Sequence, residues 1–198
     1  MTTLTRWADT DTAGAVDSAA LRTSEPDEIA AELAAVGIRY EQWPVRELPD
    51  GADAAAVLDV YRDEVDRLVG EQGFKVIDVA RLSPPAEPDD EWRATAAGAR
   101  AKFLAEHTHA EDEVRFFIEG SGIFYLHVDD SVIAVQCEQG DLLSVPALTR
   151  HWFDMGTTPA FAAIRFFLDP EGWVGTFTGD DIATKFADFD TLAAAGAA

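Results

Sequence analysis

The spacing of apolar residues predicts an amphipathic helix early in the chain. Ile29, Leu33 and Val36 recur at intervals of four and three residues, which places them on one face of a helix. Ser24 stands where it can cap the start of this helix, and Gly37 stands where it can end it.

The same periodicity predicts two further helices in the first half of the chain. One is expected to begin near Asp53 and to carry a single apolar stripe, and another runs from about residue 89 to 104. Short strands are expected at residues 3–8 and 74–82. The stripe of the first of these helices consists of Val57, Tyr61, Val65 and Leu68.

From His107 onward the pattern changes to short runs of apolar and β-branched residues separated by glycine or aspartate turns. Six strands without intervening helices favour a mainly β fold, an antiparallel barrel or sandwich with the N-terminal helices packed outside it. The six segments are 114–119, 123–129, 131–137, 141–145, 151–154 and 161–168.

Composition narrows the class of protein. The 198 residues are 47% hydrophobic, which suffices for one domain with its own core. A mean hydropathy of -0.06 without a long apolar run argues against a membrane span, and the single Cys137 excludes an internal disulfide. The chain carries a formal net charge of -22, which repels nucleic acids and anionic membranes and disfavours self-association. No basic segment precedes an apolar one at the N-terminus, so we expect a cytoplasmic monomer.

Three of the four histidines, together with one glutamate, have the spacing of a metal site. His107 and His109 alternate, so on an extended segment both imidazoles face the same side. Glu113 can reach the same centre from the next strand, and His151 from a later one. Three imidazoles and one carboxylate suit iron, nickel, manganese or zinc, and they leave two adjacent positions open on an octahedral ion. Those positions could take a chelating substrate or dioxygen.

These residues resemble the cupin superfamily. Its first motif ends in His-x-His, three residues, Glu, six residues and Gly, and its second runs Gly, five residues, Pro, four residues and His. The matching residues are His107, His109, Glu113 and Gly120 in the first motif, and Gly140, Pro146 and His151 in the second. Ala101 and Leu148 stand where the family has glycine, and Met155 stands where asparagine is common.

Within the cupins, the chain resembles the acireductone dioxygenase family through HTHAEDEVRFFIEGSGIFYL and GDLLSVPALTRHWFDMG. The resemblance implies a single cupin domain over residues 1–198, with a jelly-roll barrel core at about 74–170. It also implies one Fe²⁺ or Ni²⁺ per chain and a small acireductone substrate from methionine salvage. With iron, dioxygen cleaves acireductone to 4-methylthio-2-oxobutanoate and formate; with nickel, the products are methylthiopropanoate, formate and carbon monoxide.

Two arginines are candidates to hold the substrate, which becomes an electron-rich dianion when its enediol loses two protons. Arg115 lies two residues after Glu113, so alternation points it into the barrel. The resemblance marks it as the residue that generates and holds the dianion. The alternative is a structural ion pair with Asp112 or another carboxylate. Arg165 is a second candidate, whose alternative is a solvated position at the barrel rim.

The remaining candidates surround the metal ligands. Glu106 and Asp112 are expected to accept hydrogen bonds from the ligand imidazoles, unless they are solvated loop charges. His127 is interpreted as a structural strand histidine, and Cys137 as a small buried residue. Each aromatic candidate for the pocket of the methylthio tail can alternatively be ordinary core. These aromatic residues are Phe103, Phe153, Phe166 and Trp173.

Two other functions are compatible with these patterns. One is a cupin dioxygenase or isomerase that acts on a different oxygen-rich chelate, such as a flavonol or a sugar. The other is a noncatalytic cupin used for ligand binding, which would tolerate the loss of metal ligands. All four ligands are present here, and Arg115 favours a small anionic substrate.

Overall fold

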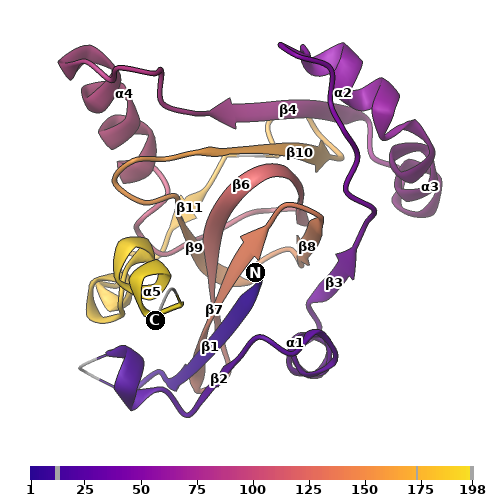
Figure 1. Cartoon of the computed structure of the whole chain (residues 1–198). Coiled ribbons are helices and arrows are strands. Elements are labelled where there is room, and N and C mark those ends of the chain that lie inside the picture. Colours follow the sequence, from indigo (N-terminus) through magenta and orange to yellow (C-terminus); the bar gives the residue numbers. More distant parts are fainter. Residues whose placement is uncertain (12–13, 173, 197–198) are drawn as a thin grey trace.

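The structure is a computed structural model that describes residues 1–11, 14–172 and 174–196. Its strands form the centre and its helices lie around them (Figure 1). The strands are β1 (Thr3–Ala8), β2 (Leu21–Thr23), β3 (Arg39–Gln42), β4 (Val76–Leu82), β5 (His107–Thr108), β6 (Glu113–Val128), β7 (Ser131–Glu138), β8 (Asp141–Val145), β9 (Arg150–Asp154), β10 (Phe161–Phe167) and β11 (Thr176–Phe177). The helices are α1 (Pro26–Ala35), α2 (Ala54–Val60), α3 (Arg62–Gln72), α4 (Asp90–Ala101) and α5 (Phe189–Gly196), with 3-10 turns at Val16–Ser18 and Ile182–Lys185.

The fold is mainly β and antiparallel, as the sequence predicted. One hydrogen-bonded path runs β11-β5-β9-β6-β7-β1-β2, while β10 joins β4 to β6 and β8 joins β3 to β6. This path does not return to itself, so the barrel is not closed by hydrogen bonds. Strands β1, β2 and β3 also belong to the strand network, although they lie before the range of about 74–170 expected for the barrel core.

The long strand β6 belongs to both halves of the sheet. Residues 114–119 and 123–129 were expected to be separate strands, but they form one continuous strand that pairs first with β8 and β10 and then with β7 and β9. Gly120 has a φ of 61°, and a Cβ there would lie 1.8 Å from the carbonyl oxygen of Ala160. A Cβ at Gly122 would lie 2.4 Å from the Phe153 ring. The glycines therefore permit a close approach of β10 and β9 to β6, where a hairpin turn was expected.

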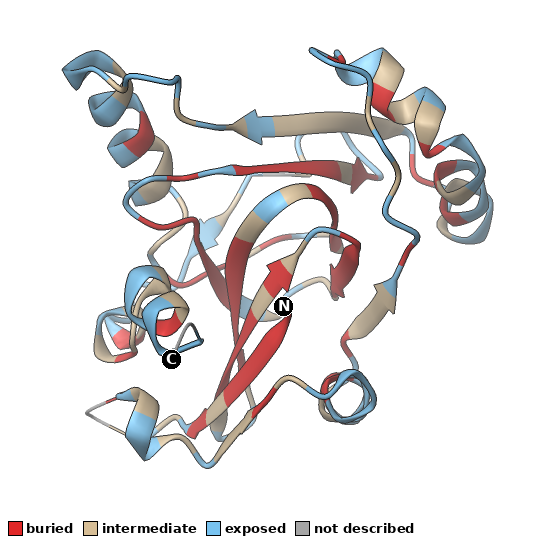
Figure 2. Cartoon of the chain, in the orientation of Figure 1, coloured by how far each residue is buried: buried red, intermediate tan, exposed pale blue. Residues whose placement is uncertain are grey.

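Runs of buried residues follow the central strands (Figure 2), and because successive residues of a strand point to opposite faces, both faces are covered. The inner face of β6 contributes Phe117 and Phe124 to the core between the sheets. Its other face packs Val114, Phe116 and Ile118 beneath α2 and α3, which places these helices outside the barrel, as expected. Every described strand residue of β8 and four of the five in β9 are buried, so the strands that reach the metal ligands are held rigidly.

The helices differ from expectation in their boundaries. Glu25 is the N-cap of α1, whereas the Ser24 hydroxyl lies 3.1 Å from that of Thr3. The second helix divides at Tyr61, whose backbone (φ -104°, ψ 20°) leaves the helical range between α2 and α3. Helix α4 ends before residue 104 because the carbonyl of Phe103 accepts a hydrogen bond from the Phe153 amide in β9.

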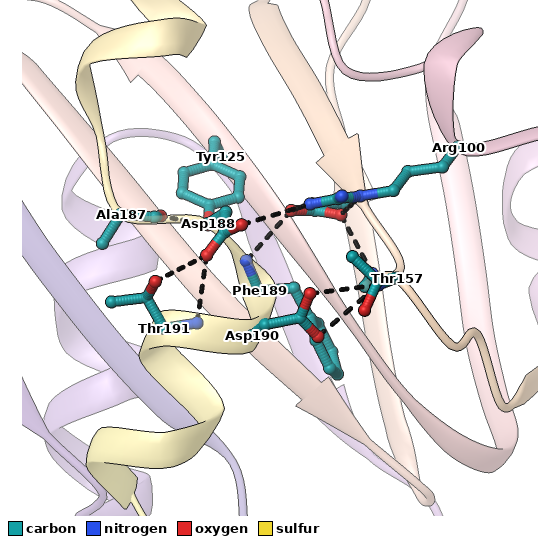
Figure 3. Close-up of polar contacts among 10 residues, drawn as sticks. Arg100, Tyr125, Thr157, Ala187, Asp188, Phe189, Asp190 and Thr191 are labelled. Atoms are coloured by element: carbon teal, nitrogen blue, oxygen red, sulfur yellow. Dashed lines mark hydrogen bonds and ion pairs between the residues drawn. The ribbon is translucent and has the colours of Figure 1, made fainter. Parts of the chain in front are cut away.

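The C-terminal segment, for which the sequence predicted no element, forms helix α5 and packs against the outer face of the sheet. Asp154 at the end of β9 accepts hydrogen bonds from Nε and Nη2 of Arg100, at 2.6 and 2.8 Å, and from the Phe189 amide at 2.9 Å. Figure 3 labels these two partners, Arg100 and Phe189. Asp188 accepts the amide of Thr191, which caps the start of α5. These long-range bonds fix the segment to α4 and β9. Among the described residues, no helix has the length and apolar character needed to cross a membrane.

Candidate metal centre

Three strands bring the four predicted ligands together. His107 and His151 are directly opposite each other where β5 pairs with β9. Glu113 begins β6, opposite Val145 of β8, and the later part of the same strand pairs with β9. His109 follows β5 by one residue, so alternation directs it to the same side as His107. The ligand set therefore follows from strand register, and all four side chains are buried.

The potential ligand atoms of these residues all lie within 4.8 Å of one another. The Nε2 atom of His151 is 2.8 Å from Oε2 of Glu113, and Nε2 of His109 is 3.4 Å from the same oxygen. The imidazole ring centroids of His107 and His151 are 4.5 Å apart. Bonds of about 2.0–2.2 Å to one ion place opposite ligand atoms about 4 Å apart, so the cluster has the dimensions of a metal site.

Backbone carbonyls orient two of the imidazoles. Nδ1 of His107 is 2.8 Å from the carbonyl oxygen of Ala105, and Nδ1 of His151 is 2.8 Å from that of Thr149. Because a carbonyl oxygen only accepts, each Nδ1 must carry a hydrogen, so Nε2 of each ring is the nitrogen that faces the cluster.

Burial and charge set the protonation of the cluster. Burial lowers the pKa of His107 to about 4, and the neighbouring His151 adds to this effect. For His109, burial acts in the same direction, but the hydrogen bond and charge of Glu113 outweigh it and raise the pKa above its usual value. Burial alone would raise the pKa of Glu113, but the positive charge of Arg115 and the hydrogen bonds from His109 and His151 hold that pKa well below its usual range. An ionised carboxylate and imidazoles that release any Nε2 proton on binding form the donor set that a divalent metal requires.

Arg115 lies beside the cluster and pairs with one of its ligands. Its Nε donates to Oε1 of Glu113 at 2.7 Å, and both side chains are buried. The guanidinium carbon lies 5.1–5.9 Å from the centroids of three aromatic rings, those of Phe103, Phe124 and Phe153. The anticipated ion pair exists, but its carboxylate is Glu113, and the Asp112 alternative is excluded by this geometry.

A cavity of about 230 Å³ opens onto two of the ligands. Most of its lining is apolar, and Val174 and Phe177 form an exposed rim. A small substrate with an apolar tail fits a cavity of this character. Its lining consists of Lys102, Phe103, His107, His109, Val174, Gly175 and Phe177.

Comparisons with known proteins agree with this site. The sequence profile of the ARD/ARD′ family matches residues 11–175. Proteins named acireductone dioxygenase from Frankia alni and Saccharopolyspora erythraea are 56% and 52% identical to the chain. Each alignment covers 98% of the chain and, respectively, 91% and 99% of the relative. The chain belongs to the acireductone dioxygenase family.

A solved structure of the acireductone dioxygenase family has the same fold. The acireductone dioxygenase from Bacillus anthracis, solved with a cadmium ion in its active centre, superimposes with a TM-score of 0.74 and is 28% identical. The match covers 89% of this chain and 98% of that one. Together with the four buried ligands, this likeness identifies the cluster as a site for a divalent metal.

The aromatic candidates separate into different environments. Phe103 lines the metal cavity, and Phe153 packs in the inner core against the Arg115 guanidinium. Phe166 lies on the opposite face of β10, against Phe74 and Trp43, so it belongs to the outer core and does not bound the cavity. Trp173 lies outside the described residues.

Arg165 is opposite Arg115 where β10 pairs with β6, and it lines a neighbouring cavity of about 340 Å³. Two of its nitrogens bond both carboxylate oxygens of Asp78, at 2.8 and 2.6 Å. Arg165 is therefore a partly exposed side chain paired with a counter-charge, and it lines the cavity next to the metal cavity.

The two carboxylates that flank the ligands contact other groups than expected. Glu106 accepts from Nδ1 of His127 at 2.5 Å and from the Thr178 hydroxyl at 2.7 Å, while Asp112 accepts from the Ala147 amide at 2.9 Å. The expectation that they accept from ligand imidazoles is wrong, because backbone carbonyls fill that role for His107 and His151. Glu106 instead connects β5 to the segment after β11, and Asp112 fixes the turn before β9.

His127 and Cys137 lie apart from the four-residue cluster. His127 is buried and held by Glu106, and Cys137 is fully buried in the inner core. Leu148 has a φ of 65°, a left-handed conformation that explains why the cupin motif has glycine at this position. Its amide nevertheless donates to the His109 carbonyl at 2.9 Å, so the turn retains the contact beside the ligand.

Sequence reasoning missed four residues of the metal cavity. Val174, Gly175 and Phe177 come from the segment around β11, which has only two strand residues and no detectable periodicity. Lys102 falls within a predicted helix, where a lysine is ordinary and indicates no site. Only the proximity of these residues to the ligands, which depends on long-range strand pairing, reveals them.

Proposed function

We propose that this chain catalyses the cleavage of acireductone by dioxygen, with one Fe²⁺ or Ni²⁺ held by the four ligands. The observation that carries the proposal is the convergence of His107, His109, Glu113 and His151 next to a small apolar cavity, in a member of the acireductone dioxygenase family. The proposal extends to both product sets: 4-methylthio-2-oxobutanoate and formate with iron, and methylthiopropanoate, formate and carbon monoxide with nickel.

The donor set fits the ion, since imidazoles and a carboxylate accept several divalent transition metals. Such an ion supplies Lewis acidity and a template for two oxygens of the enediol. All four ligands belong to one chain, which supports one ion per chain and a monomer that works without a second copy. The cytoplasm as the site of action is part of the same proposal.

Arg115 supplies positive charge to the reacting anion. Its Nε and one Nη atom contact Glu113, and its remaining N–H groups are available to the enediolate oxygens. The rings of Phe103, Phe124 and Phe153 surround the guanidinium and exclude water. In this water-poor environment its charge stabilises an anion more strongly than it would in solvent.

The apolar cavity receives the methylthio tail. Phe103, Val174 and Phe177 present carbon surfaces against which a thioether packs favourably. Phe153 contributes from the inner core, and Arg165 acts next to the cavity, where its charge is shared with Asp78. Glu106 and Asp112 serve as positioning residues that hold the segments around the ligands.

The proposal is tested with acireductone generated under nitrogen and then exposed to dioxygen. Protein loaded with iron or nickel should accelerate the loss of the enediol absorbance, whereas metal-free protein should not. Arg115→Ala should still bind one ion and should lose turnover by roughly a hundredfold or more, the scale of removing one preorganised donor. No acceleration with either metal would refute the function, and normal turnover of Arg115→Ala would refute the role of Arg115.

A further inference from the structure

We propose that Lys102 is a positioning residue that attracts the anionic substrate to the mouth of the metal cavity and holds it there. The inference deepens the proposed function and rests on it, since the substrate must be an enediolate. It assigns a role to a cation that the sequence did not single out.

Lys102 occupies a junction between two cavities. It is exposed, follows α4 directly as its C-terminal cap, and lines the 230 Å³ cavity together with His107 and His109. It also lines the adjoining cavity of about 340 Å³, to which Arg165 belongs. The hydrogen bond from the Phe153 amide to the Phe103 carbonyl fixes this segment against β9, one residue after Lys102. The backbone of Lys102 is therefore held beside the metal site while its ammonium group stays free to move.

The other cations near the site already have partners. Arg115 is paired with Glu113, and Arg165 forms two bonds with Asp78. Among the described residues that line these two cavities, Lys102 is the cationic side chain without a hydrogen bond or ion pair to a carboxylate. Its charge is thus available to a ligand.

An approaching anion needs such a charge because the protein as a whole repels it. The net charge of -22 creates a negative field, and a local positive charge at the mouth of a cavity counteracts that field where the substrate enters. The mobile, hydrated ammonium of a lysine suits the first contact with an approaching substrate, whereas the buried guanidinium of Arg115 suits the bound state. Lys102 should therefore act on substrate capture more than on the chemical step.

A structural explanation for Lys102 also exists, because a cation at the C-terminus of α4 interacts favourably with the helix dipole. That role would change the thermal stability of the protein. It would leave KM unchanged at both low and high salt.

The test compares Lys102→Gln and Lys102→Arg with the wild type, all loaded with the same metal. Lys75→Gln is the matched control, because Lys75 is also exposed, has no ion pair among the described residues, and lines neither cavity. Acireductone binding is measured under nitrogen from its absorbance spectrum, and KM and kcat are measured with dioxygen. Each measurement is made at about 0.01 M and about 1 M salt, where the Debye length falls from about 30 to about 3 Å.

At low salt, Lys102→Gln should weaken binding and raise KM by roughly two- to fivefold with kcat nearly unchanged, the range of a single solvent-accessible charge pair. Lys102→Arg should restore both, Lys75→Gln should match the wild type, and high salt should remove the difference. Equal binding and KM for Lys102→Gln and the wild type at low salt would overturn the proposal, as would an equal loss that persists at high salt. If the wild type itself neither binds nor consumes acireductone, the proposed function has failed instead.

Discussion

At the scale of single residues, the metal centre depends on how each ligand holds its protons. Glu113 keeps a negative charge despite burial because Arg115 and two imidazoles face it. The same carboxylate stabilises the protonated form of His109, while burial keeps His107 neutral. A proton and a metal ion therefore compete for His109, and this competition determines the pH at which the centre loads.

Metal affinity should fall as the pH drops below the raised pKa of His109, by about tenfold per pH unit, because binding must displace one proton. His107, with a pKa of about 4, should not contribute between pH 5 and 7. In the metal-free protein the sign is opposite: the raised pKa of His109 contributes stability below its ordinary value of 6.5, and this is lost as the pH rises through the folded-state pKa.

Calorimetric titration of the metal-free protein with Ni²⁺, in buffers of different ionisation enthalpy, measures both the affinity and the protons released. We expect the release of at least one proton per ion in the lower part of that range, the one from His109. An affinity independent of pH from 5 to 7 would contradict the assigned protonation of His109.

At the scale of elements, α5 is held by one buried carboxylate. Asp154 is 1% exposed and satisfies Arg100 from α4 together with the amides of Gly156 and Phe189 (Figure 3). Substitution of Asp154 by asparagine should lower the free energy of unfolding by about 3 kcal/mol, the lower end for a broken buried pair, because the partly buried guanidinium of Arg100 loses its main counter-charge. Denaturant unfolding measures this. Asp59→Asn, which removes an exposed pair with Arg62, is the control and should leave the midpoint unchanged. A midpoint shift for Asp154→Asn as small as that of the control would contradict the role of Asp154.

The elements also show what local sequence patterns could and could not predict. β1 and β8 have the predicted boundaries, and the ligands follow from alternation and spacing, which are local properties. Gly120 and Gly122 wrongly suggested a turn. Their actual role is to leave room for the start of β10 and for a ring from β9, and it depends on residues about 30–40 positions away that a local pattern does not show. Helix α5 was missed for a similar reason, since Asp154 stabilises it from 35 residues away. Likewise, the partner of Asp112 is an amide 35 residues further on.

At the scale of the whole molecule, the fold places the ligand cluster next to a largely apolar cavity within a strongly acidic protein. Pairing of β5 with β9 aligns two of the ligands, and Val174 and Phe177 lie exposed at the opening of that cavity. The net charge of -22 makes the few cations near that opening, Arg115, Arg165 and Lys102, decisive for an anionic substrate.

The most direct test of the central claim is the rate of acireductone loss as Fe²⁺ or Ni²⁺ is added stepwise to metal-free protein. The rate should rise in proportion to the metal bound and stop rising at one ion per chain, and His151→Ala should show no such rise. Lys75→Gln, which changes an exposed residue that lines neither cavity, should follow the wild type. A rate that does not depend on the metal, or a rise in His151→Ala equal to that of the wild type, would contradict the account.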